Sequence, residues 1–104
     1  MSFVRAAAEG EVARGTALRV VIAGRPVAVV RTAEGRLFAV DDTCTHEEAS
    51  LSGGFVEGNT IECPHHGATF DLETGRALTL PATSGLRTYE VKVEKGEILI
   101  NFIE

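Results

Sequence analysis

The sequence predicts an all-β protein, an antiparallel β-sandwich or small barrel that acts as a scaffold for an inserted loop-rich segment. The chain has 104 residues, enough for one domain with a single modest core. Eleven glycines, only three prolines and few aromatic residues suit a protein with many turns. Short runs rich in β-branched residues, separated by turn signals, occupy both ends of the chain and favour strands over helices.

The amino-terminal part is expected to form a meander of strands that pack as one sheet. Gly24-Arg25-Pro26 and Glu34-Gly35 are turn signals between its β-branched runs. A polar loop with one irregular helical turn is expected over residues 9–16. The expected strands cover residues 3–6, 17–23, 27–32 and 36–40.

The character of the chain changes at Asp41. From there to residue 85, glycines and Pro81 recur at short intervals, so only short strands are expected. These short strands cover residues 55–56, 60–62, 69–71 and 76–78. Gly53, Gly54 and Gly67 are expected to serve a positive φ or a close approach of the backbone.

Regular alternation returns after residue 85. Over 86–94, Tyr89, Val91 and Val93 alternate with polar residues and are expected to face the core, as is Phe102. A turn at 94–96 then leads into a last strand over 97–103. We therefore expect a single domain, 1–104, in which a scaffold of about 1–40 and 86–104 brackets a loop-rich lobe of about 41–85.

Composition and charge exclude several classes of protein. No run approaches the roughly 20 apolar residues that a membrane helix needs, and no secretory signal is evident. We therefore expect a cytoplasmic protein without a membrane partner. Net charge is −5, acidic residues occur along the whole chain, and Lys and Arg form no basic stripe, which argues against nucleic acid as a partner. In a cytosolic chain, two cysteines are more often metal ligands or buried thiols than a disulfide.

Candidate metal ligands gather in two short segments. Cys44-Thr45-His46 and Cys63-Pro64-His65-His66 contain both cysteines and all three histidines of the chain. Each segment can present one thiolate and one imidazole from a tight loop, which gives the four ligands of a structural zinc site or of a [2Fe–2S] cluster. Ligand softness does not choose between these two sites, and either His65 or His66 could be the ligand of the second segment.

The residues around the ligands resemble the Rieske ferredoxin family over about residues 38–93. The matching positions are Leu51-Ser52, Gly54, Gly67, Phe70-Asp71, Thr74-Gly75 and Pro81-Ala82, together with the two ligand segments. This resemblance implies the Rieske (ISP-like) fold and one [2Fe–2S] cluster. It implies that Cys44 and Cys63 bind one iron, that His46 and His66 bind the other at the exposed tip, and that His65 is a neighbour.

The resemblance also bears on the redox potential. Neutral imidazoles leave the oxidised cluster uncharged, which raises the potential to about −150 to +300 mV, against about −400 mV for plant-type clusters. High-potential respiratory members of the family have disulfide cysteines where this chain has Ala49 and His65, and hydroxyl donors where it has Ala68 and Phe70. Four acidic residues near the first ligand segment should lower the potential further: Asp41, Asp42, Glu47 and Glu48. We therefore predict the low end of the Rieske range.

The function expected from these residues is electron transfer, not catalysis. No nucleophile–base pair stands out, and protein ligands would close all four cluster positions. The chain most resembles the ferredoxin components of bacterial aromatic-ring-hydroxylating dioxygenase systems. Such a carrier would take electrons from an NAD(P)H-dependent flavoprotein ferredoxin reductase and pass them to a terminal Rieske oxygenase. We expect a monomer that docks transiently through less than about 1,200 Å².

Two other functions are compatible with the sequence. One is a small Rieske subunit of an assimilatory nitrite reductase, and the other is a structural zinc-binding module without a redox role. Glu47 and Glu48 fit either a docking edge or a solvated loop. The sequence does not indicate which aromatic substrate the system would oxidise.

Overall fold

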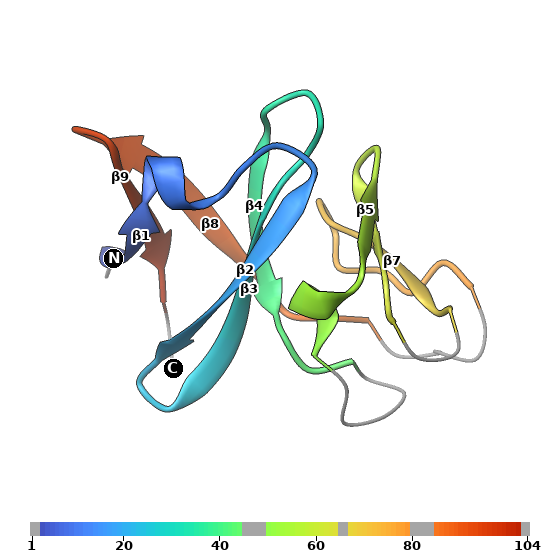
Figure 1. Cartoon of the computed structure of the whole chain (residues 1–104). Coiled ribbons are helices and arrows are strands. Elements are labelled where there is room, and N and C mark those ends of the chain that lie inside the picture. Colours follow the sequence, from blue (N-terminus) through green and yellow to red (C-terminus); the bar gives the residue numbers. More distant parts are fainter. Residues whose placement is uncertain (1–2, 45–49, 65–66, 80–84, 103–104) are drawn as a thin grey trace.

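The computed structural model consists of two antiparallel β-sheets, which confirms the all-β prediction (Figure 1). It describes residues 3–44, 50–64, 67–79 and 85–102. The larger sheet has the strand order β1-β9-β8-β4-β3-β2. Its strands are β1 (Phe3–Ala8), β2 (Thr16–Ile22), β3 (Arg25–Arg31), β4 (Leu37–Asp41), β8 (Thr88–Glu94) and β9 (Glu97–Asn101). The edge strands β1 and β2 also approach each other, so the sheet curls towards a barrel.

The smaller sheet lies beside β2, β3 and β4, on the side away from β1 and β9 (Figure 1). Its strands are β5 (Phe55–Glu57), β6 (Thr60–Glu62) and β7 (Thr69–Asp71). Two single-turn 3-10 helices complete the described elements, η1 (Glu9–Glu11) and η2 (Leu51–Gly53). No helix of the described residues is long and apolar enough to cross a membrane.

The expected strand over 76–78 does not form. This segment makes only an isolated bridge, between Ala77 and Phe70, although the Leu78 N–H donates to the carbonyl of Thr69 (2.8 Å). Just before this segment, the carbonyl of Gly75 accepts a bond from the backbone N–H of Leu86 (2.6 Å). Segment 76–78 therefore follows β7 without becoming a fourth strand.

Both faces of β3 are buried, so β3 and its neighbour β4 form a wall between two cores. The four residues from Val27 to Val30 are all 0% exposed. Because side chains alternate along a strand, Val27 and Val29 face one core and Ala28 and Val30 face the other. The uninterrupted apolar run in the sequence is typical of such a strand.

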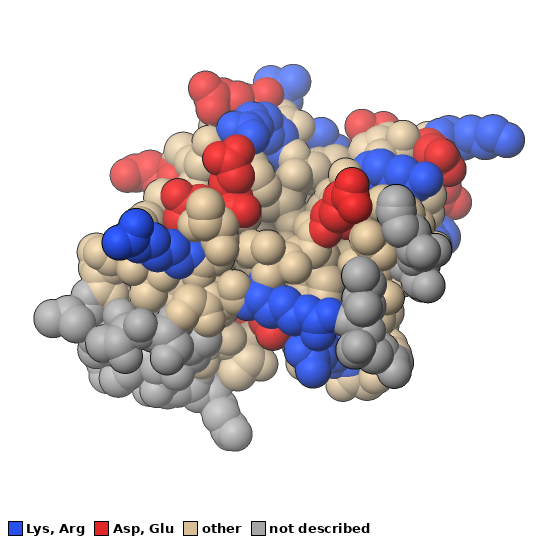
Figure 2. Space-filling view, turned by 180° about the vertical axis from the view of Figure 1, so that it is seen from behind, with Lys and Arg blue, Asp and Glu red and all other residues tan. Residues whose placement is uncertain are grey.

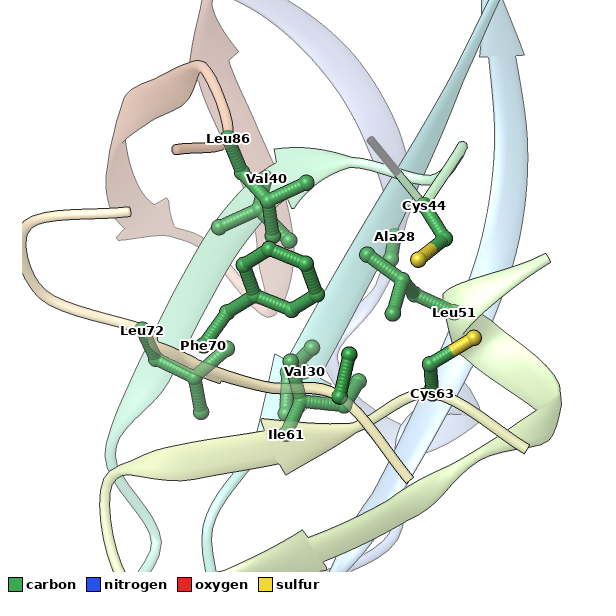
Figure 3. Close-up of a cluster of buried hydrophobic side chains, with 11 residues drawn as sticks. Ala28, Val30, Val40, Cys44, Leu51, Ile61, Cys63, Phe70, Leu72 and Leu86 are labelled. Carbon is green, nitrogen blue, oxygen red and sulfur yellow. The ribbon is translucent and has the colours of Figure 1, made fainter. Parts of the chain in front are cut away.

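The first core lies between this wall and the smaller sheet (Figure 3). It comprises Ala28, Val30, Val40, Cys44, Leu51, Ile61, Cys63, Ala68, Phe70, Leu72 and Leu86. The second core lies inside the curled sheet and comprises Val12, Val27, Val29, Ala39, Tyr89, Ile98, Ile100 and Phe102. Tyr89 and Phe102 are core residues as expected, and Val91 packs against this core. Val93 was expected in the core, but it is 41% exposed because it sits beside the turn at the end of β8.

Two of the two-residue hairpin turns are of the kind in which both central residues have a positive φ. Ala23 and Gly24 have φ values of 51° and 81°, and Lys95 and Gly96 have values of 51° and 77°. The turn after β2 is therefore one residue earlier than the signal at 24–26 suggested. Pro26 lies inside β3 opposite Val21. This pair is the one next to the turn-closing pair, where the two residues exchange no hydrogen bonds, so the missing N–H of Pro26 costs no bond to β2.

Two of the three glycines singled out in the sequence have a steric role. Gly67 has a φ of 71°, and a Cβ on Gly54 would lie 1.9 Å from the carbonyl oxygen of Glu62. Gly53 has open space around it, because no heavy atom lies within 4 Å of the place that a Cβ would take, and its φ is not positive. The close approach at Gly54 brings the end of η2 against β6, next to Cys63.

Gly54→Ala should therefore lower the free energy of unfolding by about 1–3 kcal/mol, because the new methyl group forces the backbone of β6 away. Gly53→Ala, one residue earlier, should be neutral or slightly stabilising, because its methyl group meets nothing. Chemical denaturation of the two variants and the wild type measures the difference. Equal stability of the two variants would contradict the steric explanation.

Candidate metal centre

Cys44 and Cys63 lie in the same buried core although 18 residues separate them in the sequence. Cys44 follows β4 and is 3% exposed, and Cys63 follows β6 directly and is 1% exposed. Figure 3 shows both sulfur atoms at one edge of the core, with Leu51 drawn between the two residues. The structure thus brings together the two predicted thiol ligands and keeps water from them.

Each ligand segment is closed at its base by antiparallel backbone pairing. Thr43 forms a bridge with Ser50 on either side of the first segment. In the second, the N–H of Cys63 donates to the carbonyl of Ala68 (2.7 Å). Each cysteine therefore stands at the start of a loop whose two ends are held together, which is how a tight loop presents ligands to one site.

The predicted ligands His46 and His66 lie outside the described residues, as do His65, Ala49, Glu47 and Glu48. The structure therefore describes two of the four predicted ligands. Two buried cysteines on two closed loops fit a [2Fe–2S] cluster, which needs thiolates on one iron. They fit a structural zinc site as well.

A buried carboxylate sits at the base of the first ligand segment. Asp42 has a side chain that is 2% exposed. Its Oδ1 accepts a bond from the backbone N–H of Ser52 (2.7 Å), and its Oδ2 accepts one from the hydroxyl of Ser50. The guanidinium of Arg19, on β2, lies 3.3 Å from the same Oδ2. The backbone carbonyl of Asp42 also accepts a bond from Leu51 (2.7 Å).

The neighbouring Asp41 belongs to a second polar group. Its Oδ1 accepts a hydrogen bond from the hydroxyl of Tyr89 (2.5 Å), and its Oδ2 lies 3.5 Å from Nη1 of Arg25. Burial and the Asp41 carboxylate raise the pKa of Tyr89 above its ordinary value of 10.0, while Arg25 and Arg87 act in the opposite direction. The guanidinium of Arg87 stacks over the Tyr89 ring at 4.9 Å.

These pairings weaken one sequence-based expectation. Asp41 and Asp42 were expected to lower the redox potential through their negative charge, but each has an arginine within 3.5 Å. A compensated carboxylate exerts a weaker field than an unpaired one. Ala68 and Phe70, which lack the hydroxyl donors, are both 0% exposed and belong to the same core as the two cysteines.

The Rieske [2Fe-2S] domain family matches residues 2–90 of the chain. The chain belongs to this family. In Rieske centres two histidines replace two of the four cysteine ligands of a [2Fe–2S] cluster. The cofactor of the protein is therefore one Rieske-type [2Fe–2S] cluster.

Two relatives of known function cover almost the whole Rieske chain. The ferredoxin component of the naphthalene 1,2-dioxygenase system of Pseudomonas aeruginosa is 41% identical over 99 residues, which are 95% of this chain and 94% of that protein. The 3-phenylpropionate/cinnamic acid dioxygenase ferredoxin subunit of Escherichia coli (strain K12) is 43% identical over 105 residues, covering 100% of this chain and 97% of that protein. Both relatives are electron-transfer components of dioxygenase systems, not catalytic subunits.

Solved structures agree with this family assignment. A chain in the complex of reduced oxygenase and oxidized ferredoxin in carbazole 1,9a-dioxygenase has a TM-score of 0.85 at 39% identity, covering 93% of this chain and 99% of that chain. A putative NADH-dependent nitrite reductase small subunit from Mycobacterium tuberculosis has a TM-score of 0.88, covering 99% of this chain and 96% of that chain. At 23% identity, the latter shows only that the fold is shared.

The network around Asp42 was not foreseen from the sequence. In the sequence, Asp42 is one of several acidic residues near Cys44, and Ser52 is part of the family pattern; neither position predicts a hydrogen bond. The one signal was the position of an acid two residues before the predicted ligand Cys44, with serines at the far end of the loop. Arg19 carried no signal at all, because its approach depends on how β2 packs against η2.

The pairing of Tyr89 with Asp41 makes a titration testable. Asp41→Asn should lower the pKa of Tyr89, because the carboxylate that disfavours the phenolate is removed. Tyr89 is the single tyrosine and the chain has no tryptophan, so the difference absorbance of the phenolate reports this residue alone. An unchanged or higher pKa in Asp41→Asn would contradict the pairing.

The same shift sets a pH range for stability. The folded-state pKa of Tyr89 is above the ordinary value of 10.0, so its contribution is complete below pH 10.0 and is lost as the pH rises through the folded pKa. Denaturation curves should therefore show less alkaline destabilisation in Tyr89→Phe than in the wild type.

Proposed function

We propose that this Rieske protein is the ferredoxin component of an aromatic-ring-hydroxylating dioxygenase system. It would accept single electrons from an NAD(P)H-dependent flavoprotein ferredoxin reductase and pass them to a terminal Rieske oxygenase. The observation that carries this proposal is the full-length similarity, at 41% and 43% identity, to two ferredoxin components. We further propose that the protein works as a cytoplasmic monomer.

The cluster ligands are proposed to be Cys44 and Cys63 on one iron and His46 and His66 on the other. Burial of both cysteines in one core and closure of both loops support this assignment. When bound, the cluster takes up and releases one electron. The chain itself holds the two thiolates at fixed places and excludes water from them. The two proposed histidine ligands belong to the loops that follow these cysteines. Residues 41–85 would thus act as the cluster-binding lobe on a scaffold of 1–40 and 86–104.

Charge distribution supports docking through this lobe. Residues 41–85 contain eight of the fifteen acidic residues and one of the ten basic residues, a net charge of −7, whereas the rest of the chain has a net charge of +2. On the face shown in Figure 2, Lys and Arg side chains are interspersed with Asp and Glu and do not gather into one basic stripe. We infer that both redox partners present basic surfaces, which would steer the lobe towards them.

The outward face of the smaller sheet carries part of this charge. Val56, Ile61 and Phe70 form a row that faces the first core, so the rows on either side of it face outwards. The outward rows hold Phe55, Glu57, Thr60, Glu62, Thr69 and Asp71. Phe55 is 65% exposed at the edge of this acidic face, close in sequence to η2, and offers a partner an apolar contact.

Reconstitution of electron flow tests the proposal. The oxidised protein is mixed with NADH, a flavoprotein reductase and a terminal oxygenase encoded near its own gene, together with an aromatic substrate. We expect the visible absorbance of the protein to bleach through the reductase, and product to form with the protein in catalytic amounts. Stable stoichiometric co-purification with a nitrite reductase, without turnover by any oxygenase, would instead establish the subunit role. A zinc module would leave the family match unexplained.

The ligand assignment predicts opposite results for two variants. Cys44→Ser should lose the cluster, because an iron ligand is removed. His65→Leu should retain the cluster and serves as the matched control, because His65 lies in the second ligand segment but is not assigned to iron. Visible absorbance with iron and sulfide content measures both. A colourless His65→Leu protein would show that the wrong histidine was assigned.

A second prediction concerns the redox potential, which we propose to lie at the low end of the Rieske range. Phe70→Tyr should raise the midpoint potential, because a hydroxyl donor near a ligand sulfur stabilises the reduced, more negative cluster. Phe38→Tyr is the control: it makes the same chemical change in a residue that packs against the same core, on β4. A redox titration in which Phe70→Tyr behaves like Phe38→Tyr would refute the hydrogen-bond explanation.

A further inference from the structure

Asp42 has an unusual position for a charged residue. Among the residues that the structure describes, it is the single charged residue that is buried, at 1% exposure. A buried carboxylate is costly unless donors surround it. The donors here are the Ser52 N–H, the Ser50 hydroxyl and the Arg19 guanidinium. A group that is desolvated and fully supplied with donors is held in one place.

Two of the three donors, on Ser50 and Ser52, lie at one end of the first ligand loop, and the carboxylate lies at the other. Asp42 precedes Cys44 by two residues, whereas Ser50 and Ser52 follow the loop. Ser50 and Ser52 also bond to each other through their hydroxyl oxygens (2.8 Å). Hydrogen bonds to the Asp42 carboxylate therefore hold the two ends of the loop over residues 44–49 together. They act in addition to the backbone bridge between Thr43 and Ser50.

The same residue fixes the surroundings of Cys44. Its backbone N–H donates to the carbonyl of Pro26 (3.1 Å), which anchors it to β3. Its backbone carbonyl holds Leu51 (2.7 Å), whose side chain packs in one core with Cys44 and Cys63 (Figure 3). A change at Asp42 would therefore reach Cys44 both through the loop and through Leu51.

We propose that Asp42 is a positioning residue for the cluster: its carboxylate holds the two ends of loop 44–49 and thereby places the Cys44 thiolate. Arg19 compensates the negative charge of the buried carboxylate, which would otherwise disfavour reduction of the cluster. This proposal rests on the proposed role of Cys44 as a ligand. The carboxylate suits the task better than an amide, because only a carboxylate offers two acceptor oxygens to three donors.

The first test is the rate at which the holoprotein loses its visible absorbance in an iron chelator. Asp42→Ala should lose the cluster about tenfold faster than the wild type or more, as expected when a group that orients a ligand is removed. Ser50→Ala, which removes one donor, should lie between. Asp71→Ala is the matched control. The Asp71 carboxylate accepts two backbone bonds, from Glu73 (2.8 Å) and Thr74 (3.1 Å), in the turn that follows β7. This variant should release the cluster at the wild-type rate.

The second test examines the charge compensation by the sign of a change in potential. Asp42→Asn keeps the shape of the side chain but leaves Arg19 uncompensated, so the midpoint potential should rise. Arg19→Gln leaves the carboxylate uncompensated, so the midpoint potential should fall. A pair whose charges do not act on the cluster gives no reason for shifts of opposite sign. Asp42→Asn should also release the cluster more slowly than Asp42→Ala, because it retains one acceptor.

The outcomes discriminate between the two levels of the proposal. Equal release rates for Asp42→Ala and Asp71→Ala would overturn the positioning role, and unchanged potentials in both Asp42→Asn and Arg19→Gln would overturn the charge compensation by Arg19. Where Asp42→Ala takes up no cluster, Ser50→Ala and Asp42→Asn decide by the same criteria. Retention of the cluster by Cys44→Ser would overturn the ligand assignment itself. Loss of the cluster in Cys44→Ser with normal release in the Asp42 variants leaves the ligand intact and rejects only the positioning role.

Discussion

Burial of β3 on both faces is the constraint on which the rest of the structure depends. Val27 and Val29 complete the core inside the curled sheet, and Ala28 and Val30 complete the core under the smaller sheet. The two cores therefore share one wall of backbone. A strand that must satisfy both sides tolerates neither a shift of register nor a polar substitution, since one slipped residue exchanges the faces. The core that contains Cys44 and Cys63 packs against this rigid wall.

Polar contacts then refine what apolar packing begins. Packing brings Cys44 and Cys63 to one edge of the first core, but it does not determine the path of the loops that follow them. Backbone pairing at Thr43 and Cys63 closes these loops, and the Asp42 carboxylate accepts from donors in three directions. An electron carrier benefits from this order, because a site that moves little between its two charge states needs little rearrangement for each transfer.

Local patterns in the sequence were sufficient to predict most strands and the meeting of the two cysteines. The short strands at 60–62 and 69–71 have the predicted bounds, since alternation and glycine turns determine them locally. The strand predicted at 76–78 was wrong because this segment makes only an isolated bridge to β7, and a local pattern does not show how far a pairing extends. Val93 was misplaced because alternation does not reveal that this end of β8 lies beside a turn, away from the core. The histidine ligands stay a prediction. Local patterns could not predict the contact between Arg19 and Asp42. These residues are 23 positions apart, and their contact requires β2, β3 and η2 to be in place first.

The two ends of the described chain lie side by side, because Phe3 of β1 pairs with Asn101 of β9. Both strands are on the side of the larger sheet that faces away from β5, β6 and β7 (Figure 1). A linker joined near either residue would therefore leave the molecule opposite the edge where Cys44 and Cys63 meet. The protein could be attached to an electrode, or fused to a reductase, with the same orientation from either end and with its redox side turned outwards.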